Sequence, residues 1–485
     1  MNTKKEHLFS NQIYKMIIFS FIIGMLLPSI IGWLILRLIE GETPVLFRVE
    51  RITLGIILGT TLTTFLFFLA NTIDLISFTR NGFLLVCILS IVLLTWLFMR
   101  MKVHWPKNQP IKFAMSPPLS NKIKIIIGVF GMWILFKIIT ASVLLIGSPP
   151  YLDDTLKNWN MRGKVYFVAQ DLVLSPHGNS IANSSPEGIF SYPPTVPLVK
   201  TFLASIAGSW NEGLINAPHI LWYIVSLLLM FFFLRRHLNI IWSLGGMYLL
   251  SSLPLYLIHG AQAYADLYLS IHIFAAIYLL FNAIKEENEK RRICFLHLSG
   301  FSAALLAFTK NEALLLHAPI YVLVFMLTIF FMKQSNLLTT RQMKKVVLNV
   351  FLLFILIALP WLIFKWMNNL TFGNAKAISG LGIGWQPGVL RTLWLNTFFE
   401  ANWLFLFPLL ISLLIIRWKK IFLSPLALLA VFFILVFGQQ ICLYMFTSLS
   451  TEAIRQTGYG RGIAQLIPIA VALIIFVLKG IWNRE

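Results

Sequence analysis

The chain has 485 residues, of which 58% are hydrophobic and 12% charged, and its mean hydropathy is +0.81. A soluble chain carries about 25% charged residues, so this composition excludes the soluble, fibrous and disordered classes. Because a run of about 20 apolar residues can cross a bilayer as a helix, the sequence predicts an all-α polytopic membrane protein with the lipid bilayer as a partner.

The net charge of +21 arises from 39 Lys and Arg against 18 Asp and Glu. In a soluble protein this excess would suggest nucleic acid. Here the cations cluster in short loops between apolar runs, as the positive-inside rule produces, so we expect no nucleic-acid partner. Cys87, Cys294 and Cys442 lie in or beside apolar runs and have neither disulfide-framework nor metal-ligand spacing.

About thirteen apolar segments predict membrane-spanning helices. They are residues 13–36, 52–79, 82–99, 124–147, 216–234, 240–258, 265–283, 294–309, 314–332, 346–367, 401–416, 423–447 and 463–479. The first run is long and ends at Arg37 rather than at a small-residue cleavage site, so we expect no cleavable signal peptide.

The cationic loops predict the orientation of these spans. The loops in question are residues 100–124, 235–237, 285–292, 333–345 and 417–420. With these loops in the cytoplasm, the opposite face receives the long loop 148–215 and the later loops 368–400 and 448–462. The first three spans leave two alternatives open: either the N-terminus lies outside, or one early segment does not cross.

Three segments are expected along the chain. Residues 1–121 form N-terminal helices and a cationic linker, residues 122–335 a catalytic core, and residues 336–485 a C-terminal transmembrane region. No internal repeat is visible, which argues against the inverted-repeat architecture of many secondary transporters.

Acidic side chains gather on the predicted outer face. Asp153 and Asp154 lie in loop 148–215, Asp266 starts a span, and Glu312 lies in a tight turn. Ionisable groups at a membrane boundary usually face a cavity or a partner, so we expect a cavity that opens outward. For each, a structural alternative stays open: Asp153, Asp154 and Asp266 could cap helices, and Lys310 could form only a local ion pair with Glu312.

Two segments of loop 148–215 are expected to lie along the membrane interface. Pro149–Pro150 end one span, and from Leu156 the pattern is amphipathic, which predicts an interfacial helix. Residues 192–204 repeat the plan, with prolines at the entry and Lys200 further along.

Four motifs carry a family resemblance, and they occur in a fixed order between residues 150 and 320. They are Asp153-Asp154-Thr155-Leu156-Lys157-Asn158-Trp159 with Arg162-Gly163-Lys164, Tyr192-Pro193-Pro194-Thr195-Val196-Pro197-Leu198 with Trp210-Asn211-Glu212 and Asn216-Ala217-Pro218, His259 through Tyr264-Ala265-Asp266-Leu267, and Thr309-Lys310-Asn311-Glu312-Ala313. Together they resemble the bacterial membrane glycosyltransferases of the GT-C superfamily, in the branch related to protein O-mannosyltransferases and the lipid A aminoarabinose transferase. The chain departs from the family at Asp153, where Trp is frequent, and at Ala313, where Gly is frequent.

The resemblance implies a GT-C-type helical bundle and an inverting sugar transfer at the outer side of the bacterial inner membrane. The donor would be a polyprenyl-phosphate-linked sugar, and the acceptor a glycan, lipid or protein of the cell envelope. Asp154 matches the position of the general base, and Asp153 is a secondary catalytic candidate. Lys310, with Arg162 or Lys164, would stabilise the leaving phosphate, and Asp266 would orient the acceptor, bind a metal or position Lys310.

Other residues of the same motifs are candidate pocket residues: Trp159, Tyr192, His259, Tyr264, Asn311 and Glu312. A lone histidine at the end of a span is more often a structural residue, so that alternative stays open for His259. The resemblance requires no cofactor and leaves a divalent metal ion open. The segments Trp385–Trp403 and Glu452–Arg461 are candidate lids or acceptor contacts, or interfacial anchors.

Two rival functions fit a cationic polytopic chain. A lipid-linked-sugar flippase or transporter would also place acids in a cavity, but the large outer loop and the boundary position of the acids argue against it. An O-antigen-type polymerase would likewise use outer loops and a lipid carrier.

Overall fold

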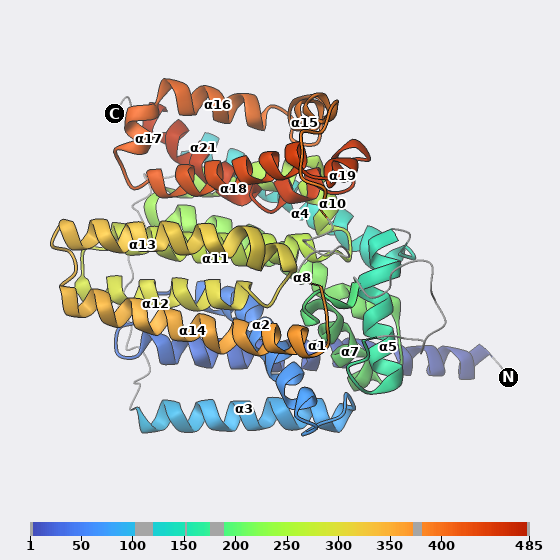
Figure 1. Ribbon diagram of the computed structural model, residues 1–485. Coiled ribbons are helices and arrows are strands. Elements are labelled where there is room, and N and C mark those ends of the chain that lie inside the picture. The colour runs from blue at the N-terminus through green and yellow to red at the C-terminus, as the bar shows by residue number, and fades with distance from the viewer. Residues whose placement is uncertain (1–2, 102–119, 151–152, 175–188, 372–380, 483–485) are drawn as a thin grey trace.

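The computed structural model describes residues 3–101, 120–150, 153–174, 189–371 and 381–482. Within these ranges the regular structure is helical, and a single isolated β-bridge joins Ile383 and Thr447. Most of the long helices lie side by side in one bundle (Figure 1). The all-α polytopic class expected from composition is therefore confirmed.

Nine helices in the described ranges are long and apolar enough to cross a membrane. They are α1 (Thr3–Glu40), α2 (Arg48–Thr72), α3 (Arg80–Arg100), α4 (Asn121–Gly147), α8 (Glu212–His237), α11 (Ala265–Lys285), α13 (Ala318–Gln334) with the π-helical segment Ala313–His317 before it, α14 (Thr340–Met367) and α18 (Ala427–Phe446). A tenth span results if α9 (Ile240–Ser252) and α10 (Pro254–Gly260), which meet at 80°, form one broken span.

The remaining expected spans are also helices, but they do not have the length and composition of a span. They are α12 (Glu289–Leu306), α16 (Leu406–Ile416) and α21 (Ile467–Trp482). The first turns of α12 carry the charged run Glu289–Arg292, while α16 has 11 residues and α21 has 16. Nine or ten spans therefore replace the expected thirteen in the described ranges, because an apolar run alone does not separate a short packed helix from a full crossing.

Short helices occupy both ends of the bundle. Near one end lie α5 (Met161–Ala169) with the π-helical segment Thr155–Asn160, α7 (Thr195–Ala207), α15 (Val389–Phe398), α19 (Ser450–Ile454) and α20 (Tyr459–Ala464). At the opposite end lie α17 (Trp418–Phe422) and the turn from α13 to α14 (Figure 1). The predicted outer and cytoplasmic loops thus segregate to opposite ends.

The contacts of α1 and α2 show at which end of the bundle α1 begins. The end of α1 and the start of α2 are joined by an ion pair between Glu40 and Arg51 (2.6 Å), beside the cationic end of α8. At the far end of α2, Asn71 donates to Asp171 of loop 148–215 (2.9 Å). Helix α1 therefore begins at the end that carries loop 148–215, as in the first of the two alternatives.

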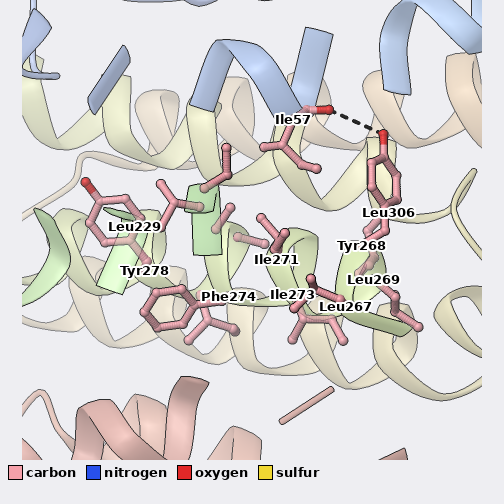
Figure 2. Packing of buried hydrophobic residues seen from close by; sticks show 14 of the residues in the cluster. Ile57, Leu229, Leu267, Tyr268, Leu269, Ile271, Ile273, Phe274, Tyr278 and Leu306 are labelled. Atoms are coloured by element: carbon pink, nitrogen blue, oxygen red, sulfur yellow. Dashed lines mark hydrogen bonds between the residues drawn. The ribbon is translucent and has the colours of Figure 1, made fainter. Parts of the chain in front are cut away.

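Helix α11 lies at the centre of the core. It is apolar on all sides and nearly all of it is buried, which is typical of a helix enclosed by others. Its residues pack against Ile57 of α2, Leu229 of α8 and Leu306 of α12, and the Tyr268 hydroxyl donates to the Ile57 carbonyl oxygen at 3.5 Å (Figure 2). Because Asp266 lies in the first turn of α11, this packing gives the carboxylate a rigid support.

The division of the chain at residues 121 and 335 stays a prediction. Helix α1 packs against α7, α8 and α12, and α14 packs against α12 and α13. Helices from all three segments therefore share contacts within the bundle.

Candidate active site

The Asp154 carboxylate accepts hydrogen bonds from the segment that directly follows it and from Arg461, which is distant in the sequence. Its Oδ2 accepts hydrogen bonds from Trp159 Nε1 (3.3 Å) and Arg461 Nη2 (2.7 Å), and its Oδ1 accepts a long bond from Asn158 Nδ2 (3.4 Å). It makes no capping hydrogen bond to the helix that follows. The capping alternative is therefore wrong for Asp154, whose side chain faces the site instead.

Asp153 has the opposite environment. Its side chain is 76% exposed and pairs with Lys157, one helical turn on, at 2.7 Å. Exposed pairs of this kind stabilise a protein by less than about 1 kcal/mol. The two adjacent aspartates thus point to different surroundings, and only Asp154 contacts the other candidate residues.

Asp266 is buried and surrounded by donors. Its Oδ1 accepts hydrogen bonds from Lys310 Nζ (2.8 Å) and Gln465 Nε2 (2.9 Å), and its Oδ2 accepts from Arg461 Nε (2.9 Å). The carboxylate also lies in the first turn of α11, where the helix dipole favours an anion. Its negative charge is therefore firmly compensated in this arrangement.

Arg461 joins the two aspartates. Its Nη2 lies 2.7 Å from Asp154 Oδ2 and 2.8 Å from Asp266 Oδ2. Burial lowers the pKa of this guanidinium, but Asp266 and Asp154 outweigh burial and hold the pKa well above its ordinary value. The guanidinium also lies 4.8 Å from the centre of the Tyr264 ring. The sequence indicated Arg461 only as part of a candidate lid, acceptor contact or interfacial anchor, because its charge alone gave no sign of a partner three hundred residues earlier.

Lys310 is already occupied by two acids. Its Nζ lies 2.8 Å from Asp266 Oδ1 and 3.1 Å from Glu312 Oε1. Burial lowers the pKa of Lys310, while Asp266 and Glu312 raise it, and the net shift is upward. Lys310 therefore stays charged, and its local ion pair with Glu312 is only one of its two ion pairs.

The residues brought together form a carboxylate cluster, by which we mean Asp154, Asp266, Glu312, Lys310 and Arg461. The cluster holds three acids and two cations, so it carries one net negative charge when all five are ionised. This net negative charge would repel an anionic phosphate unless a further cation were close.

Aromatic rings border the carboxylate cluster. The Trp159 indole is buried and meets the Tyr192 ring edge-on at 5.7 Å, and Lys310 Nζ lies 5.9 Å from the centre of the same tyrosine ring. Burial, with Glu312 and Asp154 nearby, raises the pKa of Tyr192 well above its ordinary value. Trp159 and Tyr192 thus form an aromatic border of the cluster. The raised pKa keeps the Tyr192 phenol neutral.

His259 packs against Tyr264, the ring that Arg461 also contacts. Its ring centre is 6.0 Å from that of Tyr264, and both of its ring nitrogens are buried without a hydrogen-bond partner in the described ranges. The described ranges thus contain no hydrogen bond that would support the structural alternative for His259.

A second cationic group, the Arg162–Lys365 pair, lies behind Tyr192. Arg162 is buried and its Nη2 donates to the Tyr192 carbonyl oxygen (2.8 Å), while Lys365 Nζ donates to the Ser191 carbonyl oxygen (2.7 Å) and to Asn311 Oδ1 (3.0 Å). Arg162 Nε and Nη1 have no hydrogen-bond partner in the described part of the chain. Buried donors without partners are costly, which makes this pair a candidate anion site.

Lys164 and Lys365 show what sequence reasoning placed and missed. Lys164 is exposed and makes no described contact with the carboxylate cluster, because it lies two residues from Arg162 and so faces another side of α5. Lys365 was not named, although a lysine inside the apolar run 346–367 is a signal of function. Asn311 accepts a hydrogen bond from Lys365 and donates one to the Ser191 hydroxyl.

The motif around Trp210 forms a separate buried network. Glu212 accepts hydrogen bonds from Trp210 Nε1 and Asn160 Nδ2 (both 2.6 Å), and Lys200 Nζ donates to Asn160 and Asn216 (both 2.7 Å). Burial lowers the pKa of Lys200 to about 7, although Glu212 acts in the opposite direction. The network ties α7 and α8 to the segment that carries Trp159.

Helix α7 differs from the interfacial helix that was expected. All thirteen of its residues are buried. The sequence suggested an interfacial position because Lys200 needed a polar environment, and the amide oxygens of Asn160 and Asn216 provide one inside the protein.

The described residues contain no group of three or more His, Cys, Asp or Glu side chains that could hold a metal ion. In the carboxylate cluster the oxygen atoms of Asp266 are bound by lysine, arginine and glutamine instead.

The long helices packed side by side, with short helices at both ends, define an all-α polytopic membrane protein whose fold is that of a GT-C-type bundle. A solved structure that shares this fold is ArnT from Cupriavidus metallidurans bound to undecaprenyl phosphate, with a TM-score of 0.52 and 12% identity. The match covers 73% of this chain and 60% of that one. The chain thus matches about three fifths of the solved protein. No protein-family model matches the chain, and no curated protein matches it in sequence.

Proposed function

We propose that the chain is an inverting membrane glycosyltransferase that moves a sugar from a polyprenyl-phosphate donor to a hydroxyl acceptor. The observation that carries this proposal is the Asp154–Arg461–Asp266 arrangement, in which a partly exposed carboxylate shares a partly exposed arginine with a buried one. The fold it shares with ArnT, whose structure contains undecaprenyl phosphate, supports the same class of donor.

Asp154 is proposed as the general base. Within the described ranges its Oδ1 accepts only the 3.4 Å bond from Asn158, so a lone pair of this oxygen is available to an acceptor hydroxyl. As the hydroxyl oxygen bonds to the anomeric carbon, its proton passes to Asp154. The bond from that carbon to the phosphate oxygen breaks on the opposite face, and the electron pair leaves with the phosphate, which inverts the configuration.

The leaving phosphate needs positive charge that is not already compensated. Lys310 and Arg461 are each bound to two acids, whereas Nε and Nη1 of Arg162 have no hydrogen-bond partner in the described ranges. We therefore assign the phosphate first to the Arg162–Lys365 pair, with Lys310 as a fixed neighbouring charge. Asp266 is then a positioning residue that holds Lys310 and Arg461.

The remaining assignments follow from charge and fold. The cationic loops at the α17 end favour the cytoplasm, which supports a position of the carboxylate cluster on the extracytoplasmic side of the inner membrane. The donor's tail would lie in lipid, and the acceptor would be a component of the cell envelope.

A transfer assay tests the proposal. Purified full-length protein is incubated with radiolabelled polyprenyl-phosphate sugars and envelope extracts, and both labelled acceptor and released polyprenyl phosphate are measured. Label on an acceptor supports the transferase. Movement of the labelled lipid across proteoliposomes without any transfer would instead identify a flippase.

A further inference from the structure

Three cations lie close together in sequence on or beside α17, which lies at the end of the bundle opposite α15 and α19 (Figure 1). They are Arg417, Lys419 and Lys420, at the start of and within α17. No ion pair in the described ranges includes any of them, and Arg417 Nε is buried without a hydrogen-bond partner. This group therefore presents uncompensated positive charge together with an unused buried donor.

Two hollows meet beside these cations. One, with a volume of about 370 Å³, is lined by the three cations and by the end of α21, including Phe476 and Gly480. The other is an apolar groove of about 550 Å³ between α13 and α18. Leu423 and Ser424 line both hollows, so the groove and the cationic hollow adjoin.

The surrounding surface has the character of a membrane interface. Trp418 is 53% exposed and Leu423 is 80% exposed, directly beside the lysines. Tryptophan at such a position is typical of the headgroup region, where its ring contacts both lipid and water. A soluble anion would neutralise the cations but leave the groove and Leu423 uncovered.

We propose that this end of the chain binds one anionic phospholipid, with the phosphate in the cationic hollow and an acyl chain in the groove. Charge and shape support this occupant, because an anionic headgroup suits the cationic hollow and an acyl chain suits the apolar groove. The proposal needs a membrane-embedded chain but not the glycosyltransferase reaction, so the two can fail separately.

Native mass spectrometry of the full chain tests the charge part of the proposal. Phosphatidylglycerol and phosphatidylcholine with identical acyl chains are added to protein in detergent. We expect preferential retention of phosphatidylglycerol, and its loss by about a hundredfold in R417Q/K419Q/K420Q, because each basic residue near an anionic lipid contributes roughly a fivefold gain. Equal retention of the two lipids would overturn the proposal.

The matched control is R341Q/K344Q/K345Q. It removes the same charge from exposed positions at the start of α14, at the same end of the bundle, and none of these residues lines either hollow. We expect this variant to retain phosphatidylglycerol like the wild type. If both triple variants lose the lipid equally, the effect is net charge and the proposed site is wrong.

The groove is tested by filling it. Val431 lines the groove and is partly exposed, so Val431→Trp should occupy the volume meant for an acyl chain. We expect phosphatidylglycerol retention to fall about tenfold or more, because an acyl chain that loses the burial of about two methylene groups binds roughly tenfold more weakly. Unchanged retention in Val431→Trp, combined with displacement of the lipid by soluble glycerol 3-phosphate, would show a soluble-anion site and refute the proposal. Thermal unfolding without added lipid verifies that all variants are folded.

Discussion

Replacing Asp154 and Asp153 one at a time by asparagine tests the candidate base. Asp154→Asn keeps an oxygen that can accept from Trp159 and Arg461, so folding should survive, but it removes the proton acceptor. We expect a loss of about 10²–10⁴-fold in the transfer rate, equivalent to roughly 3–5 kcal/mol in the barrier. Asp153 is 76% exposed and contacts only Lys157, so Asp153→Asn should change the rate less than about twofold.

The assay measures initial transfer rates at saturating donor for the wild type and both variants. Monodispersity and the thermal midpoint of each variant show whether the fold is kept. Arg461 retains its bonds to Asp266 in Asp154→Asn, so a large drop in the midpoint is not expected. An inactive Asp153→Asn with an active Asp154→Asn would place the base one residue earlier, and two active variants would refute a base at this position.

The other predictions concern the cations and the topology. Lys310→Met should lose transfer, whereas Lys310→Arg should keep part of it, because the charge between the acids is what matters; equal rates would contradict this role. Arg162→Gln should raise the donor KM at least tenfold and Lys164→Gln should leave it unchanged, as steady-state kinetics would show. In a background without Cys442, an impermeant thiol reagent should label Ser209→Cys but not Ser335→Cys in intact cells, and the reverse pattern would invert the topology.

Much of the fold was predictable because helices in membranes need apolar runs of a set length. Every expected span proved to be helical. The errors concern helices whose apolar residues pack inside the protein instead of marking a full crossing or an interfacial position. Helix α12 is buried in spite of its charged start, and α7 is buried in spite of Lys200, since its lysine bonds to amide oxygens. A hydropathy pattern reflects composition and does not show which hydrogen-bond partner a polar side chain has in the fold.

The site was predicted in the part that motifs encode. Asp154, Asp266 and Lys310 occur in motifs, and the structure places them around a shared arginine. The motifs did not indicate Arg461 or Lys365, because each acts through contacts with segments far away in the chain. A lysine in an apolar run could have marked Lys365, but nothing in the local sequence separates Arg461 from an interfacial anchor.

The position of Arg461 has a consequence for how the protein is made. Its hydrogen bond to Asp154 spans 307 residues of sequence. During synthesis the first loop, α11 and Lys310 all leave the ribosome before α20 does, so for that interval the two aspartates and Glu312 face a single lysine. Uncompensated carboxylates stay hydrated, since burying them alone is costly. The end of the nascent bundle that carries loop 148–215 should therefore remain loose until α20 arrives, and the carboxylate cluster closes only then.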